Sequence, residues 1–571
     1  MIGTSLIDLI AIRISIGFFR AITPLSILYT LTLPFLPAAF FTPTTTLLSL
    51  YPICESAFYL FVYLPRKRYL QGAAQHPPPL PAHARRALFQ KVFETIPDHD
   101  VYLTQWFLGA PSEDVKTENV REFLRWSFFN EGGGAADGLA GKSAATAGLL
   151  VESSNDSWDE EVEGEIDEYI RSMEEMMGRK FEEGRGSAES YRLTVDAVRM
   201  KHRPLIWYFI LSGIDVVTYA RLSLAGYTYH RRSPLLTIFT SFPFRLVETV
   251  SSSTPSPAPT IAYWHRPHRN PAKQPILYVY GIGIGLHPYV PMLTLLARTA
   301  PDVGIIVLEL DAINSRICAV MPTRIEITAA IYSILTHHNY IPHASTTPST
   351  SSHHDTNHSF ILAANSYGTV VTTHLLHSPH IAPYISTAIL IDPVTLLLHF
   401  PAVAYNFLRR PPRRANEHML HYYASTDPGV AHTLCRRFFW SENVLWREDL
   451  FAATATPAPP SAADNNIPSS GARQAVVYLG ERDLIVDTWS VWQYLTDTVN
   501  GSDAGGAGAP VDITYTDGEW TRRYPHGGTL KVVWCEGIDH AQVFDAERWY
   551  ARIVGDMVKA SCRPRVAETE S

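Results

Sequence analysis

Residues 360–370 read Phe360-Ile361-Leu362-Ala363-Ala364-Asn365-Ser366-Tyr367-Gly368-Thr369-Val370. The stretch begins as a short apolar run, typical of a strand buried on both faces of a sheet, and continues as a helix-like segment. A serine at such a turn is held on a strained backbone with its hydroxyl exposed at the strand end. The small residues Ala364 and Gly368, two positions before and after it, let strand and helix pass closely. The pattern predicts Ser366 as a nucleophile in this turn.

Other short apolar runs flank this stretch, and helix-length segments separate them. With Phe360–Ala364, the predicted strands are Pro275–Tyr280, Gly304–Leu310, Thr387–Ile391, Ala475–Leu479 and Leu530–Trp534. Because they are almost continuously apolar, they suit a parallel sheet that is covered on both faces. Strands that alternate with helices predict an α/β fold with a doubly wound sheet.

A glycine-rich loop, Gly281-Ile282-Gly283-Ile284-Gly285, follows the first of these strands. Acyl transfer to a serine creates an oxyanion, which backbone N–H groups must meet. We expect one donor from Tyr367 and the other from Ile282. A dinucleotide-binding loop is the alternative interpretation, but the third glycine of that motif is missing. His287, just beyond the loop, is expected to pack or to cap a helix.

Two polar residues follow later strands at their carboxyl ends. Asp483 comes just after Ala475–Leu479, and His540 comes just after Leu530–Trp534. A histidine that takes the serine proton and a carboxylate that orients it would complete a catalytic triad. We therefore predict Ser366, His540 and Asp483 as catalytic residues. Asp392 and Asp487 are the alternative acids.

With these motifs, the region from about residue 260 to 560 resembles the α/β-hydrolase superfamily. The residues that carry the resemblance are Gly281–Gly285, Ala364–Gly368, Gly480–Asp483 and Gly537–His540. The resemblance implies an eight-stranded, mostly parallel sheet with a helical cap at about residues 394–450, which would shape an apolar pocket. The sequence departs from the family pattern at Tyr280, where many members have histidine, and at Ala364, where the usual residue is glycine. Neither departure removes a reacting atom.

The N-terminal region is apolar enough to enter a membrane. Between Arg20 and Arg66 the only charged residue is Glu55, and about 20 apolar residues suffice to cross a bilayer. The proline- and threonine-rich stretch Thr42–Thr46 divides this run into Ile22–Phe41 and Leu47–Leu64. Basic residues on both sides favour a hairpin with both ends in the cytoplasm, and the prolines also suit a hairpin that dips into one leaflet.

The predicted domain organisation follows from these segments. Residues 1–68 are a membrane-anchoring segment of one or two apolar helices, which resembles that of membrane-anchored fungal hydrolase-fold proteins. Residues 69–250 are a helical region with a disordered insertion at 131–157, which is rich in Gly, Ala and Ser. Residues 260–560 are the hydrolase domain, and residues 561–571 are a tail. Within the helical region, Asp159–Glu183 has the spacing of a surface helix, and Leu205–Leu224 that of a packed or membrane-lying helix.

Composition excludes several classes of function. A net charge of -8 with 18% charged residues gives no basic field for nucleic acid. Five widely spaced cysteines show neither disulfide nor zinc spacing. Histidines 337, 338, 343, 353, 354 and 358 are numerous but lack rigid ligand spacing, so no metal or other cofactor is expected.

The function expected from these observations is a membrane-anchored serine hydrolase that cleaves carboxylic esters of lipids through an acyl-enzyme. Its expected partners are a lipid bilayer and a hydrophobic ester. We expect it in an endomembrane such as the endoplasmic reticulum, with the hydrolase domain in the cytosol. Two alternatives stay open: an inactive hydrolase-fold scaffold that binds lipid or protein, and an acyltransferase with the same triad.

Overall fold

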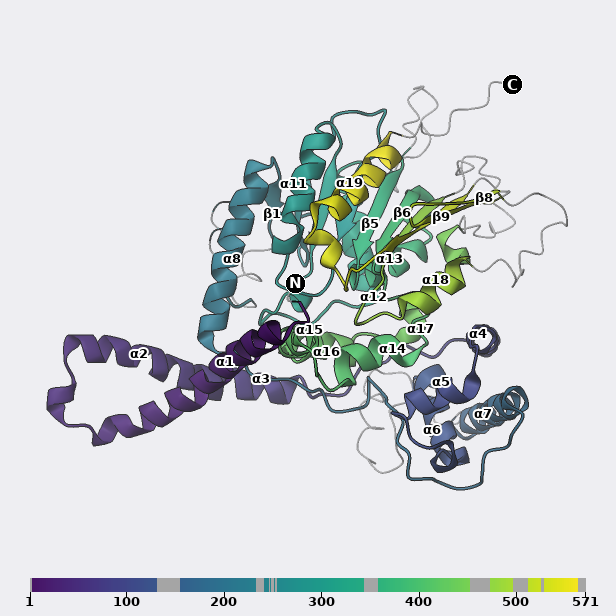
Figure 1. The fold of residues 1–571 in the computed structure, drawn as a ribbon, viewed down its shortest axis with the longest axis horizontal. Helices are drawn as coiled ribbons and strands as arrows, with labels where there is room; N and C mark the ends of the chain where they lie inside the picture. Colours follow the sequence, from purple (N-terminus) through teal and green to yellow (C-terminus); the bar gives the residue numbers. More distant parts are fainter. Residues whose placement is uncertain are drawn as a thin grey trace.

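The centre of the molecule is one large mixed sheet (Figure 1). The computed structural model describes residues 3–130, 155–232, 241–245, 247, 251, 254–342, 358–451, 473–496, 512–524 and 528–562. The strands are β1 (Thr228–His230), β2 (Ala262–Arg266), β3 (Ile276–Val279), β4 (Ile305–Glu309), β5 (Phe360–Asn365), β6 (Ile385–Ile391), β7 (Gln474–Gly480), β8 (Asp512–Thr516), β9 (Glu519–Arg523) and β10 (Thr529–Cys535). Their spatial order is β1-β2-β4-β3-β5-β6-β7-β10-β9-β8.

The six central strands, from β4 to β10 in space, run parallel, and they are the six strands that the sequence predicts. β2 runs antiparallel to both of its neighbours, β4 and β1, so β1 has the direction of the central strands. These eight strands form the mostly parallel sheet of the α/β-hydrolase fold, which confirms the expected fold class. The sheet has ten strands because the hairpin β8–β9 adds to its edge beside β10. This hairpin turns at Asp517 and Gly518, both with positive φ.

Helices cover both faces of the sheet (Figure 1). On one face α11 (Val290–Thr299) packs against α19 (Glu547–Ser561), and on the other α12 (Arg324–His337) packs against α13 (Gly368–Leu376). α18 (Thr488–Thr496) packs on β7 and β10. Since both faces are covered, β3, β4 and β5 are buried along their whole length, as their apolar sequences indicate.

The segment between β6 and β7 forms a helical cap, whose helices begin at Pro401 and end at Leu450. Its elements are α14 (Pro401–Ala404), η9 (Tyr405–Arg409), α15 (Ala415–Leu420), η10 (His421–Ser425), α16 (Pro428–Arg436), α17 (Trp440–Asn443) and η11 (Glu448–Leu450). The helices before the sheet lie against this cap. The indole N–H of Trp440 donates to the carbonyl of Ser127 at 2.7 Å, and that of Trp106 to the carbonyl of His399 at 3.3 Å.

The region 69–250 is mostly helical and shares one hydrophobic core with the sheet. Its helices are α4 (Ala82–Glu94), α5 (His99–Trp106), α6 (Thr117–Phe129), α7 (Asn155–Met177) and α8 (Leu205–Leu224). Two expectations need correction. The sheet begins inside this region, at β1, whose three residues are too few for a strand pattern to be visible. The helix α7 begins at Asn155, within the span 131–157 expected to be disordered, and residues 131–154 lie outside the described residues.

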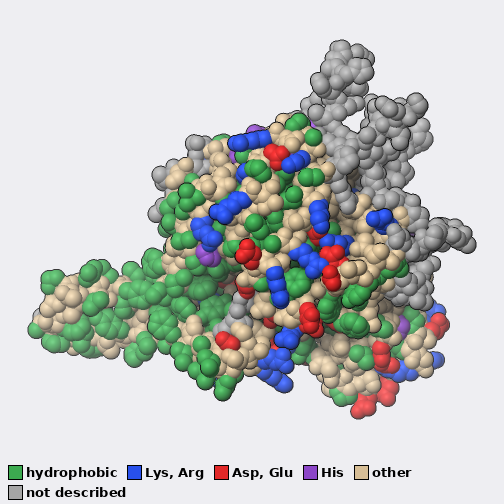
Figure 2. Space-filling view, turned by 45° about the horizontal axis from the view of Figure 1, so that its top comes forward, with side chains coloured by type: hydrophobic (Ala, Val, Ile, Leu, Met, Phe, Trp, Pro, Cys, Tyr) green, Lys and Arg blue, Asp and Glu red, His purple; other side chains and the backbone are tan. Residues whose placement is uncertain are grey.

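The N-terminus forms a helical hairpin that projects from the body (Figures 1 and 2). It consists of α1 (Leu6–Thr32), η1 (Leu33–Phe35), η2 (Ala38–Phe40), α2 (Pro43–Ala57), the π-helical η3 (Phe58–Tyr63) and α3 (Leu64–Tyr69). The predicted bounds are wrong in detail. α1 begins at Leu6, sixteen residues before Ile22, because Ser5 caps it. Thr42–Thr46 starts a helix instead of breaking one, since Thr42 is the N-cap and proline is tolerated in the first turn.

Glu55 joins the hairpin to the body. Its fully buried carboxylate accepts from the hydroxyl of Thr23 at 2.6 Å and from the backbone N–H of Leu205, the first residue of α8, at 2.6 Å. Nε2 of His202 lies 3.0 Å from the same carboxylate. The single charged residue of the apolar run is thus a structural link between three segments of chain.

We predict that Glu55→Ala lowers the free energy of unfolding by about 1–3 kcal/mol, because buried donors lose their acceptor. Urea denaturation of the detergent-solubilised protein measures this change. The matched control is Glu113→Ala, which removes an exposed carboxylate. Equal losses in both variants would contradict the structural role of Glu55.

Candidate active site

Ser366 stands at the turn between β5 and α13, as the sequence predicts. Its φ of 49° lies in the left-handed region, which strains a residue with a side chain. The turn is held by the N–H of Ser366, which donates to the carbonyl of Ile391 at 2.9 Å. A Cβ on Gly368 would lie 2.2 Å from the carbonyl oxygen of Val279, so only glycine lets α13 start this close to β3.

The glycine-rich loop after β3 approaches the same serine. A Cβ on Gly281 would lie 2.7 Å from Cβ of Ser366, which no real side chain tolerates.

The two departures from the usual family pattern both fit the structure. Ala364, where the usual residue is glycine, is fully buried between β3 and β6, and the sheet accepts its methyl group. The hydroxyl of Tyr280 accepts hydrogen bonds from the N–H of Leu310 at 3.0 Å and from the amide of Asn314 at 2.6 Å, so this departure has a structural role.

The structure brings Ser366, His540 and Asp483 together from distant parts of the chain. Oγ of Ser366 lies 2.8 Å from Nε2 of His540, and Nδ1 of His540 lies 2.6 Å from Oδ2 of Asp483. The second carboxylate oxygen of Asp483 accepts from the N–H groups of Ile485 at 2.7 Å and Val486 at 2.9 Å. Both oxygens of Asp483 are therefore fixed, and the imidazole is oriented with one nitrogen toward the serine.

The alternative acid Asp392 lies beside these three hydrogen-bonded side chains but has another set of partners. Its buried carboxylate accepts from the N–H of Gly480 at 3.0 Å and from the N–H of Ala541 at 2.8 Å. It thereby ties together the two loops that carry Asp483 and His540. Burial first, and then the charge of Asp483, raise the pKa of Asp392 to about 7.

Asp539, which the sequence analysis missed, fixes the histidine loop to the cap. Its carboxylate accepts from the N–H of His540 at 2.7 Å, from the N–H of Leu484 at 2.9 Å and from the amide of Asn416 at 2.6 Å. The signal available in the sequence was an acidic residue directly before the predicted histidine. Asp487, the other alternative acid, accepts from the N–H of Ser490 and so caps the start of α18.

The histidine is surrounded by carboxylates. Burial alone would lower the pKa of His540, but the charge and hydrogen bond of Asp483, with smaller contributions from Asp392 and Asp539, raise it to about 9. The surrounding carboxylates therefore stabilise the imidazolium that forms when Nε2 of His540 takes a proton.

The two amides expected to meet an oxyanion are available. Among the described residues, neither the N–H of Tyr367 nor that of Ile282 has a hydrogen-bond acceptor. Both residues line the cavity that Ser366 opens into. Free backbone donors beside a nucleophile are what stabilisation of a tetrahedral oxyanion requires.

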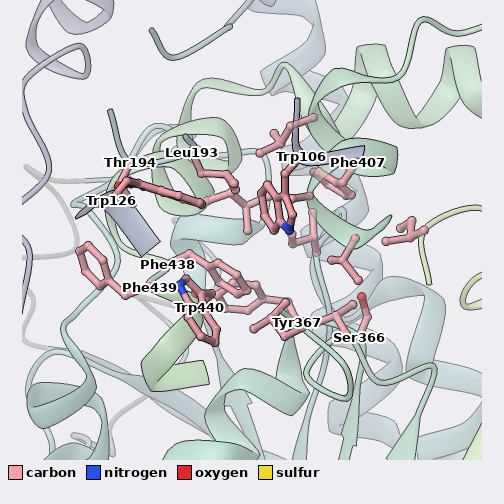
Figure 3. A pocket seen from close by; sticks show the side chains of 18 of the residues that line it. Trp106, Trp126, Leu193, Thr194, Ser366, Tyr367, Phe407, Phe438, Phe439 and Trp440 are labelled. Carbon is pink, nitrogen blue, oxygen red and sulfur yellow. Dashed lines mark hydrogen bonds between the residues drawn. The ribbon is translucent and has the colours of Figure 1, made fainter. Parts of the chain in front are cut away.

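The cavity above Ser366 is apolar and encloses about 820 Å³ of space, counted to its open mouth (Figure 3). The lining residues are His76, Trp106, Trp126, Asn130, Leu193, Thr194, Ile282, Ser366, Tyr367, Val394, Leu398, Val403, Ala404, Phe407, Leu408, Leu434, Phe438, Phe439, Trp440 and Ile485. The cap supplies one wall, as expected. The region before the sheet supplies another, which the sequence analysis missed because Trp106 and Trp126 carry no signal beyond that of packed helices.

The other histidines that the sequence singles out and the structure describes do not line this cavity. Nδ1 of His287 lies 3.2 Å from the hydroxyl of Thr218 on α8, so His287 packs between helices. Of the six clustered histidines in the sequence, 343, 353 and 354 lie outside the described residues.

Comparisons with known proteins give weak structural likenesses only. No protein-family model matches the sequence, and no curated protein matches it. Among solved structures, a membrane phospholipase A described as a bacterial virulence factor is 12% identical with a TM-score of 0.34, and the match covers 62% of this chain and 94% of that one. An esterase from Pyrobaculum calidifontis is 13% identical, with a TM-score of 0.32 and coverage of 62% and 93%. Carboxyl esterase 2 from the fungus Tuber melanosporum is 14% identical, with a TM-score of 0.31 and coverage of 53% and 84%.

We predict that Asp392→Asn lowers the pKa of His540, because a carboxylate stabilises the neighbouring imidazolium and an amide does not. Asp483→Asn should lower that pKa further, since it removes the charge in direct contact. NMR titration of the protein with isotope-labelled histidine measures both shifts. A His540 pKa below 6.5 in the unaltered protein would contradict this account of the charges.

Proposed function

We propose that this protein is a serine hydrolase that cleaves carboxylic esters of lipids at a membrane surface. The observation that carries the proposal is the hydrogen-bonded chain from Ser366 through His540 to Asp483 at the base of an apolar cavity. The nucleophile turn, the free amides and the buried acid each serve acyl transfer.

The proposed reaction has two halves. Oγ of Ser366 attacks the acyl carbonyl while Nε2 of His540 accepts its proton, and the amides of Tyr367 and Ile282 hold the oxyanion. The tetrahedral intermediate collapses as His540 gives that proton to the departing alcohol oxygen, which leaves an acyl group on Ser366. Water then attacks the acyl-enzyme with His540 as base, the acid departs and the serine regains its proton. Asp483 holds the imidazole in the required orientation throughout.

The lining of the cavity supports an apolar acyl group as the part of the substrate that is bound. The lining residues include no Lys, Arg, Asp or Glu, so nothing in that set would pair with a charge on the substrate. Each methylene group that leaves water contributes about 0.8 kcal/mol. A long acyl chain therefore gains more from this cavity than a short or charged one.

The projecting hairpin supports attachment to a bilayer. Pro43–Tyr69 and Leu205–Leu224 are long and apolar enough to cross a membrane by length and composition. Large apolar side chains stand exposed along the hairpin, among them Leu47 and Leu48 at 68% exposure each (Figure 2). Exposed apolar surface of this extent is typical of a membrane contact.

The dimensions favour a hairpin that enters one leaflet. Glu55 and the residues after it are tied to the body, because Phe58 is buried against Tyr208 and Phe242. Residues 43–54 then extend about 18 Å, at 1.5 Å per residue, against a hydrocarbon core of about 30 Å. In Figure 1, one end of α8 lies near the base of the hairpin, and the helix runs from there along the side of the body at a steep angle to the hairpin, which suits a helix lying on the membrane surface. The basic residues Arg66–Arg68 at the base favour a cytosolic hydrolase domain.

We predict that a fluorophosphonate probe labels the protein and that Ser366→Ala abolishes labelling, since the probe reacts with an activated serine. Gel fluorescence of the purified protein measures this. The matched control is Ser378→Ala, at another buried serine, which should leave labelling unchanged. Absence of labelling in correctly folded protein would instead support the scaffold alternative.

We predict that the double variant Leu47→Lys and Leu48→Lys greatly reduces co-flotation with phosphatidylcholine liposomes, because two charges at the hairpin would have to enter hydrocarbon. Ile325→Lys, at a residue 81% exposed outside the hairpin, is the control and should float normally. Unchanged flotation of the double variant would exclude the hairpin as the membrane contact.

A glycosylation acceptor placed in the turn 33–42 should stay unmodified in microsomes if the hairpin enters one leaflet only.

A further inference from the structure

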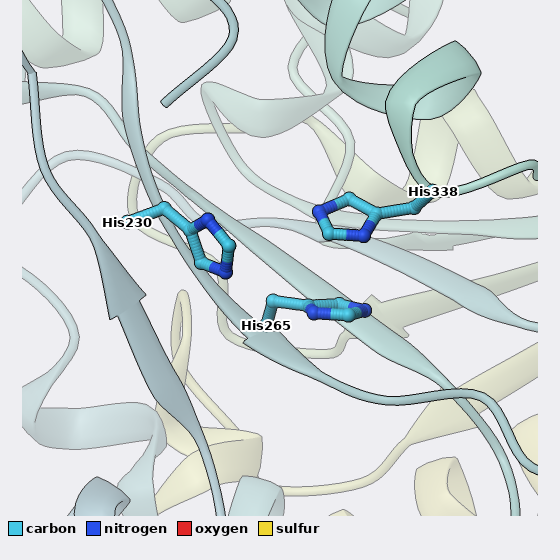
Figure 4. Close-up of side chains that lie close together, drawn as sticks. All are labelled: His230, His265 and His338. Carbon is cyan, nitrogen blue, oxygen red and sulfur yellow. The ribbon is translucent and has the colours of Figure 1, made fainter. Parts of the chain in front are cut away.

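Three histidines from separate segments meet at the β1 edge of the sheet (Figure 4). His230 ends β1, His265 lies in β2, and His338 is the C-cap of α12. One ring nitrogen of each lies within 4.8 Å of one from each of the others. In the sequence His338 stands beside His337, far from His230 and His265, so no local pattern connects the three.

The strand register puts two of the rings on one face of the sheet. His230 pairs with Tyr263 across the ladder, and His265 follows Tyr263 by two residues, so all three side chains point to the same side. The end of α12 crosses that side and lays the ring of His338 against that of His265, with centroids 3.7 Å apart. The strand register and the position of the end of α12 therefore bring the three rings together.

Tyr263 orients two of the rings. Its hydroxyl lies 3.0 Å from Nδ1 of His230 and 2.8 Å from Nε2 of His338. The ring of His230 also has a hydrogen bond to the backbone of Pro255, so a metal ion would replace one of its two partners. Among the described residues, Nδ1 of His338 and the ring nitrogens of His265 have no hydrogen-bond partner. A hydrogen bond to one ring nitrogen is the usual way to orient a histidine whose other nitrogen binds a metal.

The three imidazoles lie where a positive charge is disfavoured. Burial first, and then the charge of neighbouring histidines, with His337 among them in each case, lower the pKa values of His230, His265 and His338 to about 4, 3 and 2. Neutral imidazole is the form that binds a metal ion.

We propose that His230, His265 and His338 bind one transition-metal ion of the Zn²⁺ type, with water as a fourth ligand. Three imidazoles suit Zn²⁺, Cu²⁺ or Ni²⁺ and disfavour Mg²⁺ and Ca²⁺, which prefer oxygen. At a Zn–N distance of about 2.0–2.1 Å, tetrahedral ligand atoms stand about 3.3 Å apart. Binding therefore requires the ring nitrogens, which now lie within 4.8 Å of one another, to draw together and the facing rings of His265 and His338 to turn toward the ion.

The ion would act on the framework and not on the reaction. Strands β4 and β3 lie between β2 and β5, the strand that leads to Ser366. A metal held here would tie β1, β2 and α12 together, and β1 follows directly after the apolar helix α8. The site would thus fasten the proposed membrane-facing helix to the sheet.

The test uses the full chain in detergent, stripped of metal with a chelator and then dialysed against Zn²⁺. Elemental analysis should find one Zn²⁺ per chain, and His265→Ala should weaken binding by at least about 100-fold. His337→Ala, which removes an exposed histidine one residue from the cluster, is the matched control and should bind as the unaltered protein does. Circular dichroism of the metal-free variants checks that each is folded.

A second measurement does not depend on any variant. Co²⁺ bound to the unaltered chain should give the visible absorption of a tetrahedral nitrogen site, and Zn²⁺ should displace it. Lack of stoichiometric Zn²⁺ binding by the folded protein, equal affinity in His265→Ala, or an octahedral Co²⁺ spectrum would each overturn the proposal. The cluster would then be a hydrogen-bond network around Tyr263.

Discussion

The strained backbone at Ser366 depends on two glycines, Gly368 and Gly281, at which any side chain would clash. Gly368 lets α13 begin against the carbonyl of Val279, and Gly281 lets the loop after β3 lie against Ser366 itself. A hydrogen bond weakens when its donor–acceptor distance grows by a few tenths of an ångström. A shift of Ser366 would therefore weaken its hydrogen bond to His540. The clearance between β3, β5 and α13 thus controls the position of the hydroxyl, and the loops that carry Asp483 and His540 are arranged around it.

The parts of the structure that the sequence predicts are those with local signals. Six parallel strands are visible because burial on both faces makes them continuously apolar. Ser366, Asp483 and His540 follow strands whose carboxyl ends must share one edge, so their meeting could be inferred from strand order. The strand β2 was missed because His265 and Arg266 interrupt its apolar pattern. The hairpin β8–β9 was missed because it is polar, although Asp517-Gly518 is a recognisable signal for a tight turn.

The contacts that the sequence does not predict join segments far apart in the chain. Nothing near Trp106 or Trp126 indicates that they line the cavity above Ser366. Glu55 stands alone in an apolar run, and its bond to the start of α8 becomes visible only in three dimensions. The same holds for the three histidines, which strand register and a helix end bring together. Local patterns identify elements, whereas packing between elements decides these sites.

The shared core of the N-terminal helices and the sheet has a consequence for the evolution of the chain. A fragment starting near residue 260 would keep every reacting group but lose the wall formed by Trp106, Trp126 and Leu193. Under the proposed function, substitutions in this region would reshape the cavity, and with it the choice of acyl group, without touching the reacting groups. Selectivity and reactivity would then be encoded in different stretches of this sequence, and each could change while the other is preserved.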